Sequence, residues 1–170
     1  MSYPKLHQFD PTLKNFLFSL LFLLLVGISV GILFINQTTS FNAAGAKERF
    51  NGSEVADEFD IPEHYPKPYS EMLLTTHNHL FGFAFIIGIA GTIFYFNSII
   101  TGKLKKLLLY ELPFSVLTTF GSIWLLKYVH PNFVYLTIVS SMLLYFSLFV
   151  VIFVSMFELK FKKSHNFTSS

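Results

Sequence analysis

Four long apolar runs constrain the fold of this chain more than any other feature of its sequence. Residues 16–35, 80–100 and 133–157 carry no charged side chain, and residues 107–126 carry a single one, Glu111. A hydrocarbon core about 30 Å thick is crossed by roughly 20 helical residues, and each run reaches that length. The strands of a membrane β-barrel would alternate apolar and polar residues, which these runs do not. The runs therefore predict four transmembrane helices.

Composition excludes several classes of function. The 170 residues are 52% hydrophobic and only 13% charged, which is too apolar for an ordinary soluble domain. Cysteine is absent, so a disulfide, a thiolate metal site, a cysteine nucleophile and a covalently attached haem are all excluded. The sequence also offers no nucleophile triad, no glycine-rich phosphate loop and no basic face for nucleic acid. We expect no catalytic residues and a chain that is not an enzyme by itself.

The spacing of the runs predicts the architecture. We expect an all-α integral membrane four-helix bundle, one domain over residues 1–170, with helices at about 13–36, 71–100, 107–129 and 133–158. Residues 37–70 then form one long loop. The first run exceeds the ~7–15 residues of a signal-peptide core, so we expect a retained helix. The alternative is removal of that helix, because the Ala-Ala-Gly-Ala sequence at 43–46 loosely resembles a cleavage site.

Small residues suggest how two of these helices pack. Gly27 and Gly31 lie one turn apart in the first run, and Ala84 and Gly88 lie one turn apart in the second. Small residues at this spacing allow the backbones of membrane helices to approach closely. We therefore expect these two faces to meet.

Basic residues predict the orientation in the membrane. Eight of the twelve lysines and arginines fall in the two terminal segments and in the turn at 101–106. Because short cytoplasmic segments are enriched in lysine and arginine, both termini are expected in the cytoplasm. The loop at 37–70 and the turn between the last two helices then lie on the outer side.

This orientation brings four of the six histidines to the outer side: His64, His77, His79 and His130. Imidazole is a common ligand for metals and for haem iron. In a helix, positions i and i+2 point about 200° apart, so His77 and His79 cannot hold one ion from the same face. We favour His79 as the inward ligand, because Gly82 shares its face and leaves space for a flat macrocycle.

Two short stretches resemble a known group of proteins. Residues 73–82, LLTTHNHLFG, resemble the T-H-x-H-L-x-G signature of small bacterial four-helix membrane proteins of poorly defined function. Residues 122–128, SIWLLKY, followed by PNFVY at 131–135, resemble the second signature of that group. The likeness spans roughly residues 10–160. It implies a multi-pass protein of the bacterial inner membrane. Some members carry a c-type cytochrome segment in the outer loop, which this cysteine-free chain lacks.

That resemblance implies work in or near an electron-transfer chain, beside other membrane or respiratory-chain subunits. The H-x-H-L pattern followed by glycine is also distantly similar to the haem-binding helix of haem–copper oxidase catalytic subunits. There the histidine that matches His79 would be an axial ligand of the haem iron.

Three readings of the histidines follow. The first is a b-type haem on the outer side, ligated by His79 and His130, with His77 as a supporting partner or alternative ligand. The second is a copper or zinc site built from His64, either His77 or His79, and His130. The third is an accessory or assembly subunit of a membrane complex, with structural histidines and no cofactor. In every case the lipid bilayer is the main partner, and no nucleic acid is expected.

Overall fold

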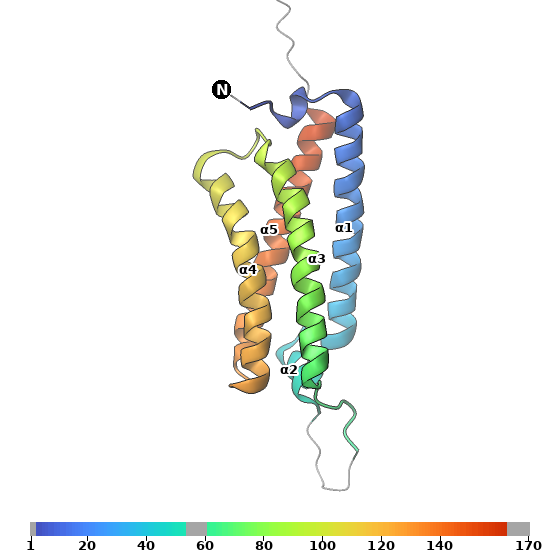
Figure 1. The fold of residues 1–170 in the computed structure, drawn as a ribbon, viewed down its shortest axis with the longest axis vertical. Coiled ribbons are helices and arrows are strands. Elements are labelled where there is room, and N and C mark those ends of the chain that lie inside the picture. Colours follow the sequence, from blue (N-terminus) through green and yellow to red (C-terminus); the bar gives the residue numbers. More distant parts are fainter. Residues whose placement is uncertain (1–2, 54–60, 163–170) are drawn as a thin grey trace, which may run out of the picture.

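A computed structural model describes residues 3–53 and 61–162, and every described element is helical (Figure 1). Its elements are a short 3₁₀ helix and five α-helices: η1 (Leu6–Gln8), α1 (Pro11–Thr39), α2 (Ala43–Asn51), α3 (Tyr69–Tyr95), α4 (Gly102–Tyr128) and α5 (Phe133–Phe161). The helices α1, α3, α4 and α5 have 27 to 29 residues each and are apolar enough to cross a membrane. The predicted all-α membrane bundle with four spans is confirmed.

Helix α5 lies at the centre of the bundle, where it packs against α1, α3 and α4. Its inward side chains Leu144, Leu148, Val151 and Ile152 are at most 1% exposed. The described ends of the chain, with η1, lie at the same end of the bundle as the α3–α4 turn (Figure 1). The helix α2 and the α4–α5 turn lie at the other end, so the four spans run alternately up and down.

Hydroxyl groups join α4 to α5 inside the bundle. Thr119 Oγ1 donates to Ser140 Oγ at 2.9 Å, and the hydroxyls of Ser122 and Thr137 lie 2.7 Å apart. Ser122 and Ser140 are buried. Small hydroxyl residues let membrane helices approach and supply hydrogen bonds that lipid cannot. This seam holds α4 and α5 in register.

The turn between α3 and α4 corrects two predicted boundaries. Helix α3 ends at Tyr95 and not near residue 100, and α4 begins at Gly102 and not at 107. The cause is Asn97, whose side-chain oxygen accepts from the backbone N–H groups of Ile99 and Ile100 at 2.9 and 2.8 Å. An asparagine that bonds the backbone ahead of it favours a turn over a continuing helix.

The segment predicted as one loop at 37–70 is partly helical. Helix α1 continues to Thr39, and α2 follows after a short turn. Asn42 begins α2, since its side chain accepts from Gly45 N at 2.7 Å. A Cβ at Gly45 would collide with the carbonyl group of Thr39, so only glycine allows α2 to fold back against the end of α1. Gly52, with φ +87°, ends α2.

The predicted pairing of small-residue faces is wrong. A Cβ added at Gly27 or Gly88 would meet no atom within 4 Å, and Ala84 is exposed. Gly31 does lie at a helix contact, but its neighbour is the Tyr145 hydroxyl of α5, 3.9 Å from such a Cβ. Helix α1 packs mainly on α5 and only marginally on α3.

The sidedness of the bundle remains a prediction and can be tested by labelling. The chain has no cysteine, so single cysteines can be introduced without background. With both termini in the cytoplasm, Glu63→Cys on intact cells should react with a membrane-impermeant thiol reagent, whereas Lys103→Cys should react only after the cells are opened. Both positions are exposed. The reverse pattern would invert the topology.

Candidate functional site

His79 is held in one tautomer by the helix that carries it. Its Nδ1 atom lies 2.8 Å from the carbonyl oxygen of Thr75, one turn earlier in α3. A carbonyl oxygen can only accept, so the proton of the neutral ring sits on Nδ1. The lone pair is therefore on Nε2. A histidine that ligates a metal almost always donates its other N–H in this way, which fixes the ring and raises its basicity.

The surroundings of His79 are aromatic on one side and open on another. Its ring centroid lies 5.3 Å from that of Phe120 in α4, and Phe120 lies 6.0 Å from Phe83. One turn further along α3, a Cβ added at Gly82 would meet no atom within 4 Å. The imidazole itself is exposed at the surface of the bundle. A flat apolar group could lie against this surface next to Nε2.

His77 and His79 lie on different sides of α3, as their spacing predicts. His77 is exposed and packs its ring on that of Phe81, with centroids 4.8 Å apart. Nearby, Trp124 Nε1 donates to Thr76 Oγ1 at 2.8 Å. This bond joins α4 to the turn of α3 that carries both histidines and holds that turn against α4.

His130 has the opposite tautomer to His79. It follows the end of α4, and its Nδ1 accepts from the backbone N–H of Asn132 at 3.1 Å. A backbone N–H can only donate, so the proton of the neutral ring sits on Nε2. Neither nitrogen then offers a free lone pair. As a ligand, His130 would first have to break this turn or lose the Nε2 proton.

His64 lies in the extended segment before α3. Its backbone is fixed by Ser53, which donates from N to the His64 carbonyl oxygen, while Ser53 Oγ accepts from His64 N, both at 2.9 Å. Its side chain is exposed. All four histidines lie toward the end of the bundle that holds α2 (Figure 1). Among residues 3–53 and 61–162, however, no three histidine or acidic side chains gather as a metal site would require.

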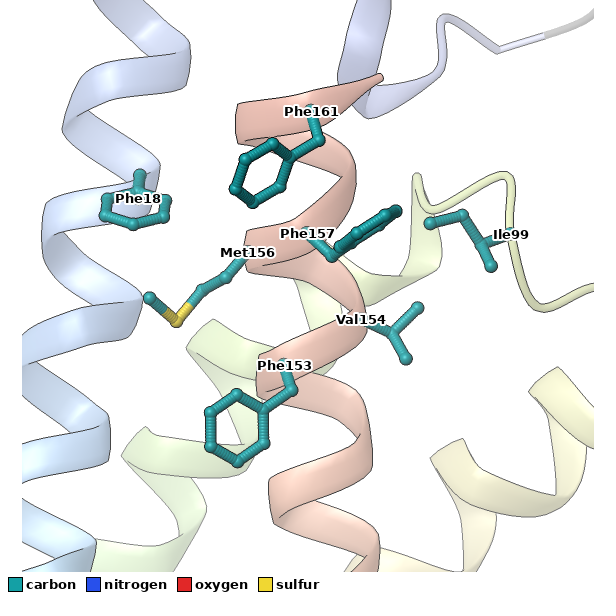
Figure 2. A pocket seen from close by; sticks show the side chains of 7 residues that line it. All are labelled: Phe18, Ile99, Phe153, Val154, Met156, Phe157 and Phe161. Carbon is teal, nitrogen blue, oxygen red and sulfur yellow. The ribbon is translucent and has the colours of Figure 1, made fainter.

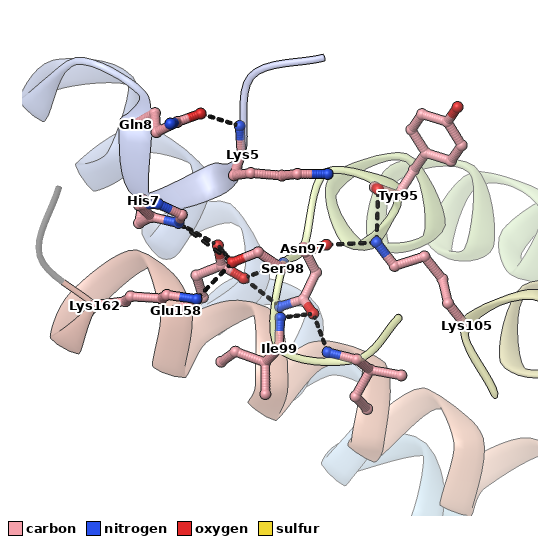
Figure 3. Close-up of polar contacts among 11 residues, drawn as sticks. Lys5, His7, Gln8, Tyr95, Asn97, Ser98, Ile99, Lys105, Glu158 and Lys162 are labelled. Atoms are coloured by element: carbon pink, nitrogen blue, oxygen red, sulfur yellow. Dashed lines mark hydrogen bonds and ion pairs between the residues drawn. The ribbon is translucent and has the colours of Figure 1, made fainter. Parts of the chain in front are cut away.

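A second polar site, which the sequence did not predict, lies at the opposite end of the bundle (Figure 3). Glu158 of α5 is fully buried. Its Oε1 lies 2.8 Å from His7 Nδ1 and accepts from Ser98 Oγ at 2.6 Å. Its Oε2 accepts from Asn97 Nδ2 and from Ser98 N, both at 2.6 Å. Lys162 Nζ also donates to Ser98 Oγ at 2.8 Å.

This cluster ties three distant segments together. It joins the N-terminal η1 through His7, the α3–α4 turn through Asn97 and Ser98, and the last turn of α5 through Glu158. Each carboxylate oxygen has two partners, so the group has little capacity left for an added ligand. Its chemistry is that of a structural joint. The polar pair Asn97-Ser98, inside a run without charges, was the one signal in the sequence that marked this place.

Removing the buried carboxylate should therefore destabilise the bundle. In Glu158→Ala, Asn97 Nδ2, Ser98 N and the His7 ring lose their acceptor, and a buried donor left unsatisfied costs about 1–3 kcal/mol. We expect a clearly lower melting temperature in detergent. Glu71→Ala is the matched control, because its i,i+4 pair with Lys67 is exposed and is worth at most about 0.5 kcal/mol. Equal melting temperatures for the two variants would contradict a structural role.

The comparisons with known proteins identify a family. No curated protein and no solved structure shows significant similarity to the chain. Residues 40–166, well over half of the 170, match the profile of a family described as a transmembrane helical domain. The match covers α2 to α5 and therefore both polar sites apart from His7. The chain belongs to the Aq_1264_TM family of transmembrane helical domains.

Proposed function

We propose that this multi-pass membrane protein binds a b-type haem through His79 and works in or near an electron-transfer chain. The single observation that carries the proposal is the tautomer of His79, whose Nδ1–H bond to Thr75 leaves Nε2 free to ligate iron. Of the four histidines expected on the outer side, His79 combines a fixed ring, a free lone pair and an exposed position.

The shape beside His79 supports a flat ligand. Phe120 is 8% exposed and Phe83 is 9% exposed, so they form a fixed aromatic wall next to the imidazole. The missing side chain at Gly82 leaves the space beside that wall open. Apolar burial and aromatic packing are the interactions that hold a porphyrin ring in a protein. A small hydrated ion would gain nothing from this surface.

The chain's own residues would have three tasks. His79 would supply one axial ligand, the Thr75 carbonyl would keep its Nε2 basic, and Phe120 would limit the rotation of the ring. Haem supplies one-electron redox chemistry when bound, and its potential depends on axial ligands and burial.

The second axial ligand would come from outside this set of residues. His130, the partner expected from the sequence, has Nδ1 engaged as an acceptor, and His77 leaves α3 on another side. Since His79 is exposed, a histidine or methionine of another membrane subunit, or of a second copy of the chain, can reach the open side of the ring. The haem would then lie at an interface between subunits. In the expected orientation, this interface faces the outer half of a bacterial inner membrane.

Visible spectroscopy tests the proposal. Protein purified from its native membrane, with any bound subunits, should give a Soret band and a reduced α-band typical of b-type haem. His79→Ala should lose both bands, because the iron loses its ligand. His77→Ala is the matched control, as it removes an exposed imidazole two residues away and should keep both bands. His130→Ala should also keep them if the second ligand lies on another chain.

Other outcomes decide between the remaining readings. Bound copper or zinc without a Soret band would replace haem by a metal site. If a folded preparation from haem-replete cells contains neither haem nor metal, the remaining interpretation is an accessory subunit. Loss of the Soret band in His130→Ala, with the fold retained, would return the second ligand to His130.

A further inference from the structure

An apolar groove runs along α5 at the end of the bundle opposite His79 (Figure 2). It has a volume of about 500 Å³ and lies between α1, α5 and the α3–α4 turn. Phe18 comes from α1 and Ile99 from the turn, while α5 supplies the remaining lining residues. This volume is within the range of ~300–1,000 Å³ that is usual for ligand sites. The lining carries no charged side chain, so the groove suits a hydrocarbon ligand.

A row of aromatic rings forms the floor of the groove. Phe153, Phe157 and Phe161 follow one another at i,i+4 spacing and are 53%, 57% and 68% exposed. The rings of Phe157 and Phe161 lie 5.3 Å apart, and Phe153 stacks on Phe149 at 5.9 Å. Exposed rings therefore follow one another over the last turns of α5. A long, narrow apolar chain can contact the whole row, whereas a compact ligand cannot.

Lysine side chains lie at the rim of this groove. Lys160 Nζ lies 5.8 Å from the ring centroid of Phe18, above the groove. Lys14 precedes Phe18 by one turn on the same face of α1. In residues 3–53 and 61–162, neither Lys14 nor Lys160 forms an ion pair. The rim is therefore positively charged and can bind an anionic group.

The acidic groups nearby, Glu158 and Asp10, are engaged by partners other than these lysines. Glu158 is fully buried, and its two oxygens are occupied by His7, Ser98 and Asn97. Asp10 uses its carboxylate to accept from Leu13 N at the start of α1. The lysines also lie at the ends of the apolar runs, which is the level of the lipid headgroups.

From this arrangement we propose that the groove binds an anionic phospholipid. One acyl chain lies along the phenylalanine row of α5, and the headgroup phosphate contacts Lys160 and Lys14. Lysine binds phosphate as a point charge, and basic sites between membrane helices favour acidic lipids. The site is independent of haem binding, because it lies at the other end of the bundle.

Lipid affinities measured by native mass spectrometry test this proposal on the full chain in detergent micelles. Dioleoyl phosphatidylglycerol should bind more tightly than dioleoyl phosphatidylcholine. Lys160→Gln should weaken phosphatidylglycerol binding about fivefold, as expected for loss of one lysine near an anionic surface, and should leave phosphatidylcholine unchanged. Lys160→Arg should keep the preference. Lys103→Gln is the matched control, since Lys103 is exposed at the same end of the bundle but, unlike Lys160, does not lie over an aromatic ring of the groove lining.

A competition experiment separates the groove from the charge alone. Inorganic phosphate should not displace the bound phospholipid, because it cannot occupy the apolar floor. Displacement by phosphate would reduce the site to a surface anion contact and overturn the proposal. Equal affinity for the two lipids, or equal effects of Lys160→Gln and Lys103→Gln, would also overturn it. If the protein forms a dimer when the lipid is removed, and added lipid does not dissociate that dimer, the groove is the contact with a second copy of the chain and the proposal is overturned.

Discussion

Hydrocarbon offers no hydrogen-bond partner, so polar groups within the spans are stabilised by partners inside the chain. This constraint explains the α4–α5 seam, where Thr119 bonds Ser140 and Ser122 bonds Thr137. It also explains the turn at Asn97, whose side chain accepts from the backbone N–H groups of Ile99 and Ile100 in the loop after α3. The packing of the bundle follows from where these polar partners can meet.

The same constraint shows why the spans could be predicted from the sequence and their ends could not. A run of about 20 apolar residues has one stable conformation in a bilayer, and the four runs alone were enough to predict four helices. The ends depend on single polar contacts. Asn97 stops α3 five residues early, and Gly45 lets the chain fold into α2 where only a loop was expected. Neither contact produces a periodic pattern in the sequence.

Packing between helices was harder still to predict. The pattern of Gly27 and Gly31 is real, but small residues indicate a close approach without naming the partner. The partner proved to be Tyr145 of α5. Likewise, Glu158 binds His7 across 151 positions of sequence, and no local pattern joins the two residues. The tautomers of His79 and His130 could not be predicted either, because each depends on which backbone group lies next to Nδ1.

The two polar sites differ in the bonding capacity that they leave unused, and this difference argues for their separate roles. Both carboxylate oxygens of Glu158 are saturated by groups from two other segments, η1 and the α3–α4 turn, so this side chain holds the fold together. His79 has one nitrogen bonded to its own helix and the other without a partner among the described residues, at an exposed position. A polar group left unsatisfied in a membrane is unfavourable unless a ligand or a partner meets it. On this physical ground, we propose that the end of the bundle with His79 carries the function and that the end with Glu158 supports the fold.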